Sequence, residues 1–107
     1  MRRGDLVTVA MPGDYGKPRP ALVIQADQFS ATASLTVALI TTSLVDAPLM
    51  RLTLEPTSEN GLRKISQVMI DKVMTVRREK LGSPFGRLDN NTMLAINRGL
   101  ALFLGFA

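Results

Sequence analysis

The sequence predicts a mainly β protein of the α+β class, a compact barrel-like sheet closed by one C-terminal helix. Two observations predict it. Several short β-branched, apolar segments are separated by turn-forming residues, and after residue 89 the apolar residues change to helical spacing. With 107 residues, we expect one domain that spans 1–107.

The first half of the chain contains four expected strands. Apolar and polar residues alternate over 5–11, which is typical of a strand. The run ALVIQ at 21–25 predicts a strand buried on both faces. The β-branched segment 34–42 predicts a third strand, and 49–54 is expected to pair with it as a fourth.

The second half is less regular until the final helix. The segment 66–70 is strand-like, and the pattern of 74–81 leaves a strand and a short helix open. A last short strand is expected at 83–88. Loops rich in turn-forming residues are expected at 12–18 and 55–61.

The C-terminal segment predicts a helix of about four turns, which begins after Asp89 or Asn90 as its N-cap. Four apolar residues recur at helical spacing: Met93, Ile96, Leu100 and Phe103. Further apolar residues widen this face. The wide face allows two interpretations, one ample core face, or a core face together with a contact between two copies of the chain.

The composition excludes several kinds of chemistry. The chain has no cysteine and no histidine, so it offers no disulfide, no thiolate metal site and no imidazole proton shuttle. Its nine acidic residues are scattered, without the spacing of a two-metal or calcium site. We therefore expect an enzyme of this sequence to work without a metal or cofactor. A cytoplasmic location is expected, and no membrane partner, because no apolar run reaches the length of a membrane span.

The net charge of +4 is concentrated late in the sequence. Five basic residues are opposed there only by Glu79: Lys72, Arg77, Arg78, Lys80 and Arg87. Such a stripe can attract nucleic acid. The alternative interpretation is an ordinary solvated face.

The stretch GDYGKPRPALVIQ at 13–25 places Arg19 between Pro18 and Pro20, at the start of an expected strand. The two prolines restrict the backbone on either side. A guanidinium fixed in this way suits the oxygens of a phosphate group. A structural ion pair is the alternative role for Arg19.

The chain resembles the PemK/MazF family of bacterial toxins, part of the CcdB/MazF superfamily. The opening GDLVTVAMPGDYGKPRPALVIQ is similar to that family's start, a basic residue and Gly-Asp, a strand, a loop, and Arg-Pro before a β-branched strand. The matching residues are Arg3, Gly4, Asp5, Arg19 and Pro20.

Two further stretches and the helix resemble later parts of the same family. VALITTS at 37–43 resembles its strand that ends in a threonine, here Thr41. VMIDKVMTV at 68–76 resembles its Asp-Gln-x-basic-Thr/Ser-aliphatic stretch. The helix that ends in LFLGF matches its last element, so the resemblance follows essentially the whole chain in order.

This resemblance implies a small SH3-like barrel, a homodimer, and the toxin component of a type II toxin–antitoxin system. It also implies metal-independent endoribonuclease activity on single-stranded RNA such as mRNA, which would inhibit translation and growth. The products would carry a 2′,3′-cyclic phosphate and a 5′-hydroxyl. The partner would be a cognate antitoxin, which lays a flexible segment across the active groove.

The resemblance also assigns roles to residues. Arg19 and Thr41 would hold the scissile phosphate, and Asp71 would act as general base if burial raises its pKa. Asp71 has alternative roles as a turn cap or as the ion-pair partner of Lys72 or Arg77. The residues that would position RNA phosphates, and that could equally be ordinary surface residues, are Lys17, Thr42, Lys72, Arg77 and Arg78.

Some residues depart from the family pattern. Lys72 stands where the family has glutamine, and Met74 stands where it has a basic residue. The chain has no tryptophan, which limits base stacking to Tyr15 and Phe29 as loop candidates. Two alternatives therefore stay open, a degenerate inactive family member and a CcdB-like poison of DNA gyrase that binds without catalysis. The apolar tail LALFLGFA favours the second.

Overall fold

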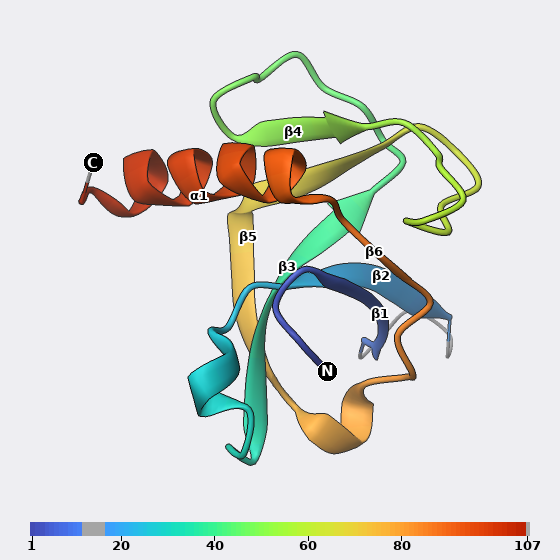
Figure 1. Ribbon diagram of the computed structural model, residues 1–107. Helices are drawn as coiled ribbons and strands as arrows, with labels where there is room; N and C mark the ends of the chain where they lie inside the picture. Colours follow the sequence, from blue (N-terminus) through green and yellow to red (C-terminus); the bar gives the residue numbers. More distant parts are fainter. Residues whose placement is uncertain (12–16, 107) are drawn as a thin grey trace.

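The chain forms one curled antiparallel sheet with a helix across it (Figure 1). A computed structural model describes residues 1–11 and 17–106, and the described strands pair in the order β4-β5-β3-β2-β1-β6. The strands are β1 (Asp5–Ala10), β2 (Pro18–Val23), β3 (Ser34–Thr41), β4 (Arg51–Leu54), β5 (Ser66–Arg77) and β6 (Gly86–Arg87). Short 3-10 turns, η1 (Asp27–Phe29) and η2 (Arg78–Lys80), follow β2 and β5, and α1 (Asn90–Leu104) ends the fold.

The predicted class, mainly β with one C-terminal helix, is confirmed. The pairing expected between 49–54 and 34–42 is wrong, because β4 pairs with β5 instead, with Leu52 opposite Val68. The reason is that β3 already has β2 on one edge and β5 on the other. The ambiguous segment 74–81 divides between the end of β5 and the turn η2.

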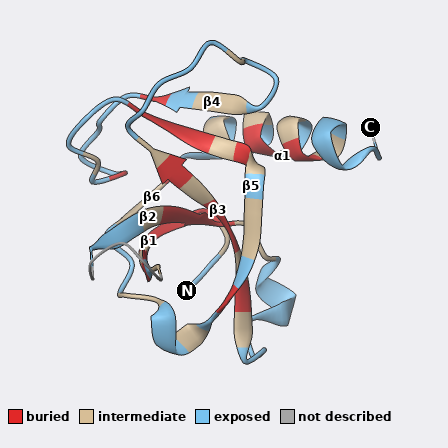
Figure 2. Ribbon diagram, turned by 180° about the vertical axis from the view of Figure 1, so that it is seen from behind, coloured by how far each residue is buried: buried red, intermediate tan, exposed pale blue. Residues whose placement is uncertain are grey.

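The sheet is buried on both faces, and each face has its own core (Figure 2). Successive residues of β2 show this, since Leu22 belongs to one core whereas Ala21 and Val23 belong to the other. The first core also contains Ile96 and Leu100 of α1. The two-faced burial predicted for the strand at 21–25 is therefore confirmed for its first three residues.

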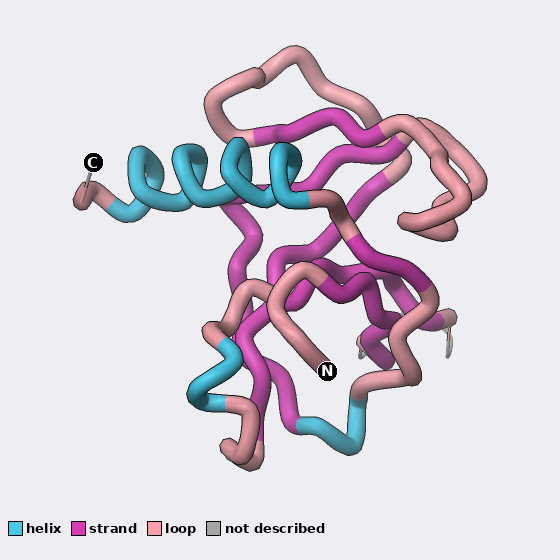
Figure 3. The backbone as a smooth tube through the Cα atoms, in the orientation of Figure 1, coloured by secondary structure: helices cyan, strands magenta, loops and turns pink. Residues whose placement is uncertain are grey.

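A sharp bend in β5 lets one strand contribute to both cores (Figure 3). Between the pairs Ala38↔Val73 and Ile40↔Val68, β3 has one residue, Leu39, whereas β5 has the four residues 69–72. Such an excess of residues on one strand is a bulge, which bends the strand and redirects side chains. Asp71 lies inside this bulge.

The helix α1 begins and ends as its sequence predicts. Asp89 is the N-cap, and its carboxylate accepts a hydrogen bond from the Thr92 amide at 2.6 Å. Gly105 ends the helix with a left-handed φ of 86°, a conformation that favours glycine. Among the residues that the structure describes, no helix is long and apolar enough to span a membrane.

Candidate functional site

The two residues predicted to hold a phosphate lie at the ends of neighbouring strands. Arg19 is the second residue of β2, held opposite Val9 of β1, and Thr41 is the last residue of β3. The β2–β3 register pairs Ala21 with Leu39. The β2–β3 pairing ends there, and Arg19 and Thr41 each lie two residues beyond this last pair, at the adjoining ends of the two strands.

The turn after β3 fixes the orientation of Thr41. Its side-chain oxygen accepts a hydrogen bond from the Ser43 amide at 3.0 Å. A hydroxyl group has two acceptor lone pairs and one proton. The Thr41 hydroxyl therefore keeps its proton available for donation to a ligand.

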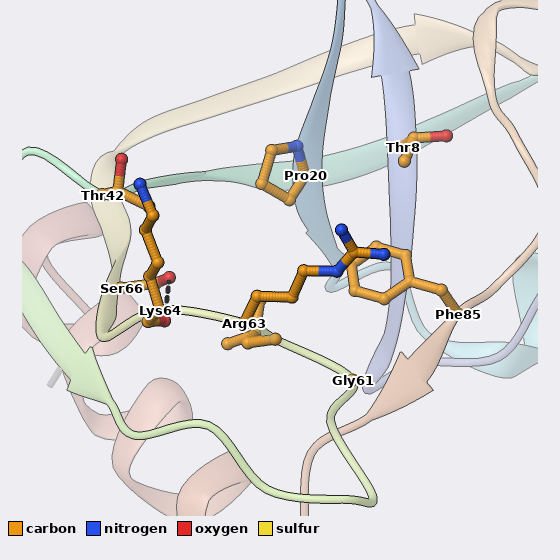
Figure 4. A pocket seen from close by; sticks show the side chains of 9 residues that line it. Thr8, Pro20, Thr42, Gly61, Arg63, Lys64, Ser66 and Phe85 are labelled. Carbon is orange, nitrogen blue, oxygen red and sulfur yellow. Dashed lines mark hydrogen bonds between the residues drawn. The ribbon is translucent and has the colours of Figure 1, made fainter.

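An open pocket of about 420 Å³ begins beside these strand ends (Figure 4). Pro20 and Thr42, the chain neighbours of Arg19 and Thr41, both line it. The complete lining is Thr8, Pro20, Thr42, Gly61, Leu62, Arg63, Lys64, Ser66 and Phe85. Thr42, predicted to contact RNA, therefore lies in this pocket, and the volume is in the usual range for ligand sites.

The pocket is positively charged. Arg63 and Lys64 come from the segment between β4 and β5, and no hydrogen bond or ion pair of either side chain occurs within the described residues. The described lining includes no aspartate or glutamate. This arrangement favours an anionic ligand. Neither residue is predicted from the sequence, because the denser basic run at 72–87 is the stronger candidate there for nucleic-acid binding. The signal for them in the sequence is a basic pair that closely follows the Gly61 turn.

The basic residues that were predicted from sequence lie elsewhere or are already partnered. Arg77 pairs with Glu79 at 3.0 Å on an exposed surface, and Arg78 donates hydrogen bonds to the Ser30 and Thr32 carbonyl oxygens of the loop after η1. Arg77 is the last residue of β5 and Arg78 the first of η2, and neither lines the pocket. Lys72 lies in the β5 bulge and Lys17 directly precedes β2, and both are exposed.

Asp71 is held by Arg51, a partner that the sequence analysis did not name. The Arg51 Nε lies 3.0 Å from Asp71 Oδ1, and its Nη2 lies 3.3 Å from Oδ2. The hydrogen bond from Arg51 lowers the pKa of Asp71 below its ordinary value and outweighs the effect of burial. The raised pKa assumed for a general base is therefore wrong.

Asp71 lies on a different strand from the other two predicted residues. Gln67 pairs with Thr41, whereas Asp71 lies four residues further along β5, in the bulge between the Val68 and Val73 pairs. Arg19, Thr41 and Thr42 lie at the adjoining ends of β2 and β3, and Asp71 is paired with Arg51 in the bulge.

Of the described aromatic residues, Phe85 lines the pocket, whereas the predicted candidate Phe29 does not. Tyr15 lies outside the described residues. Phe29 is exposed on η1, away from the pocket, whereas Phe85, which was not predicted as a candidate, lines the pocket and is 38% exposed. Within residues 1–11 and 17–106, no group of three acidic side chains could hold a metal ion.

The fold and site define a class, a small curled-sheet protein with an open cationic pocket beside its strand ends. Residues 2–104 match the model of the PemK-like, MazF-like toxins of type II toxin–antitoxin systems. The chain belongs to this family. The predicted resemblance is confirmed, and the alternative of a CcdB-like gyrase poison is not favoured.

Known proteins of similar sequence and structure support this family assignment. The chain is 54% identical over 108 residues to a probable endoribonuclease MazF from Mycolicibacterium smegmatis, covering 100% of this chain and 99% of the relative. The Mycobacterium tuberculosis toxin MazF-mt6 superposes with a TM-score of 0.83 at 21% identity, over 96% of this chain and 98% of that one. A mycobacterial endoribonuclease in complex with its cognate antitoxin superposes with a TM-score of 0.83 at 23% identity, over 100% and 97%. At these identities the two structures support the fold alone.

Proposed function

We propose that this protein is the toxin of a type II toxin–antitoxin pair and an endoribonuclease that cleaves single-stranded RNA, including mRNA, without a bound metal ion. Its family and its 54% identity to a probable endoribonuclease support this. The observation that carries the proposal is the placement of Arg19 and Thr41 at adjoining ends of β2 and β3.

RNA carries its own nucleophile, so the protein needs only to stabilise charge and move protons. The 2′-oxygen attacks the adjacent phosphorus and loses its proton, while the bond to the 5′-oxygen breaks and that oxygen gains a proton. The products are a 2′,3′-cyclic phosphate and a 5′-hydroxyl. Arg19 would bind the non-bridging oxygens as negative charge develops, and the Thr41 proton would be donated to the same phosphate.

Proton transfer by Asp71 stays a prediction. Its carboxylate is occupied by Arg51 and its lowered pKa makes it a weaker base than an ordinary aspartate. Lys17 and Lys72 remain proposed phosphate contacts, and so do Arg77 and Arg78, whose present partners would have to release them. Arg63 and Lys64 line the pocket with Pro20 and Thr42, so they are better placed than these four residues to bind an RNA phosphate.

The proposed protein partner is a cognate antitoxin. MazF proteins from Deinococcus radiodurans have been solved as MazE–MazF complexes, and this chain superposes on one with a TM-score of 0.80. We propose that an acidic, flexible antitoxin segment would cover the cationic pocket and exclude RNA from it. Neutralisation of the toxin would follow from this competition.

The test is RNA cleavage in EDTA by the wild-type protein, Arg19→Ala and the matched control Arg2→Ala, which removes an exposed arginine with no proposed role. Wild type and Arg2→Ala are expected to cut a long single-stranded RNA at discrete positions with cyclic-phosphate ends. Arg19→Ala is expected to be slower by a factor of about 100 or more, because it lacks the main charge-stabilising donor. No cleavage by the wild type, or equal cleavage by all three, would contradict the proposal.

A further inference from the structure

We propose that the pocket beside Arg19 and Thr41 binds one base of the RNA strand, stacked on the ring of Phe85. The identity of the ligand as single-stranded RNA rests on the proposed function. The base-binding role of Phe85 rests on the construction and charge of the pocket.

One wall of the pocket is a turn that Asn60 fixes from within. The Asn60 side chain is buried, with 5% of the residue exposed. Its oxygen accepts hydrogen bonds from the amides of Thr57 and Leu62, at 3.0 and 2.9 Å, and its nitrogen donates to the Glu55 carbonyl at 2.9 Å. Three bonds to one buried amide hold the segment that presents Arg63 and Lys64.

The Phe85 backbone is pressed against this turn and held on both sides. Gly61 has a φ of 69°, and a Cβ there would lie 2.6 Å from the Phe85 carbonyl oxygen. A Cβ on Gly86 would clash with the backbone carbonyl oxygen of Asn60. The Phe85 amide donates to the Leu6 carbonyl at 2.9 Å. The ring is therefore displayed from a fixed backbone, which reduces the entropy lost when a ligand stacks on it.

The lining suits a flat aromatic group that carries a phosphate. Phe85, Pro20 and Leu62 provide apolar surface, and Arg63 and Lys64 provide positive charge. Figure 4 shows Arg63 extending from the turn toward the side of the pocket that Phe85 occupies. A base can stack on the Phe85 face while the Arg63 guanidinium binds its phosphate.

The pocket is also in the right place. Pro20 and Thr42 directly follow Arg19 and Thr41 in the chain, and adjacent Cα atoms are about 3.8 Å apart. Because successive residues of a strand point to opposite sides of the sheet, Pro20, which lines the pocket, lies on the opposite face from Arg19. An RNA strand that passes over the ends of β2 and β3 would give its phosphate to Arg19 on one face and place the neighbouring base in the pocket on the other.

The first test uses Phe85→Trp, because the natural chain contains no tryptophan and the indole emission then reports this position alone. The ligand is a short 2′-O-methyl RNA, which lacks the attacking hydroxyl, so binding is measured apart from cleavage. We expect saturable quenching, with a midpoint that matches the dissociation constant from anisotropy of the labelled RNA. The matched control is Phe29→Trp on η1, where the residue is 53% exposed; its emission should not change.

A second variant measures how much the ring contributes. Phe85→Leu keeps an apolar side chain but removes the aromatic face, and we expect about tenfold weaker binding. Its circular dichroism and melting temperature should stay close to those of the wild type. On an oligonucleotide whose bases are replaced by abasic sites, wild type and Phe85→Leu should bind equally, because no base is left to stack.

The outcomes separate the two proposals. Quenching of Phe85→Trp by the 2′-O-methyl RNA, together with no cleavage of the unmodified RNA by the wild type, would support the base pocket and contradict the ribonuclease. Cleavage with no quenching, or equal RNA affinity of wild type and Phe85→Leu, would overturn the base pocket and leave the ribonuclease intact. Failure of the wild type to bind RNA at all would overturn both.

Discussion

The Arg51–Asp71 ion pair shows how a partner decides the role of one side chain. Both side chains are mostly buried, 16% and 18% exposed, and the pair connects the start of β4 to the bulge of β5. A carboxylate with two hydrogen bonds from a guanidinium is stabilised in its ionised form. Asp71 therefore supports the bend in β5 that supplies both cores.

We predict that Asp71→Asn lowers the free energy of unfolding by about 2 kcal/mol at neutral pH, because it leaves Arg51 partly buried without its counter-charge. The pKa of Asp71 is lowered by folding from its ordinary value of 3.8. The Asp71 carboxylate therefore gives its full stabilisation above pH 3.8, and this stabilisation is lost as the pH falls through the lower pKa of the folded state. Urea unfolding of both proteins at pH 7 and in acid measures this.

The difference between wild type and Asp71→Asn should shrink in acid, where the wild-type carboxylate is also neutral. Asp46→Asn, an exposed carboxylate in the loop before β4, is the control and should change stability little at either pH. A difference that stays constant with pH would show that Asp71 acts through packing. In the cleavage assay, a large loss of rate in Asp71→Asn at unchanged RNA affinity would support the predicted proton transfer.

At this scale, the sequence could predict residues that lie in local motifs. Arg19 stands between prolines at the start of a strand and Thr41 at the end of one, and the antiparallel pairing of β2 with β3 sets these two strand ends beside each other. Phe85 and Arg63 could not be predicted in the same way. Both line the pocket because Asn60 fixes the turn that carries Arg63 and because Gly61 and Gly86 let the Phe85 backbone lie close to that turn. No periodic pattern in the sequence indicates these contacts.

At the scale of elements, periodicity predicts those whose pattern is local. The helix α1 has both a cap and an apolar spacing, and β1 and β3 have alternating or β-branched runs. The partner of β4 and the continuity of β5 depend instead on which sheet edges are free. The bulge that bends β5 is likewise set by the need to cover two cores.

Two glycines with positive φ allow backbone strain to be separated from steric contact. A Cβ added at Gly105, which ends α1, would have no neighbouring atom within 4 Å, whereas a Cβ added at Gly61 would lie 2.6 Å from the Phe85 carbonyl oxygen. We predict that Gly105→Ala costs about 1 kcal/mol, the penalty of a left-handed residue. Gly61→Ala should cost clearly more, because the turn and Phe85 must also move apart. Thermal unfolding of the two variants measures the difference.

Gly61→Ala should also weaken RNA binding, since the displaced turn carries Arg63 and Lys64. Gly105→Ala serves as the matched control and should bind RNA as the wild type does. Equal costs for the two variants would contradict the role of close packing in building the pocket.

At the scale of the whole molecule, apolar side chains gather around the outer side of α1. Leu49, Leu102 and Phe106 are 73%, 59% and 71% exposed, and Figure 2 shows the C-terminal end of the helix as exposed. A cleft of about 230 Å³ lies between α1 and the segment before β4, lined in part by Leu49 and Leu102. An exposed apolar surface beside a cleft can mark a contact between proteins, which favours the interpretation that the wide helix face also contacts a second copy.

We therefore predict that the protein is a homodimer at micromolar concentration, with a mass by light scattering of twice the 11.6 kDa of one chain. Leu102→Asp should shift it toward monomers, because a charge at an apolar interface is costly to desolvate. Phe29→Asp replaces a comparably exposed apolar residue on η1 and should stay dimeric. The dimer also bears on the proposed function. Asp71 and Lys72 lie in the β5 bulge rather than at the strand ends that carry Arg19 and Thr41, so we propose that they assist cleavage in a groove formed by two copies. A monomeric wild type that cleaves RNA at full rate would contradict that groove and would assign the chemistry to the Arg19–Thr41 end of a single chain.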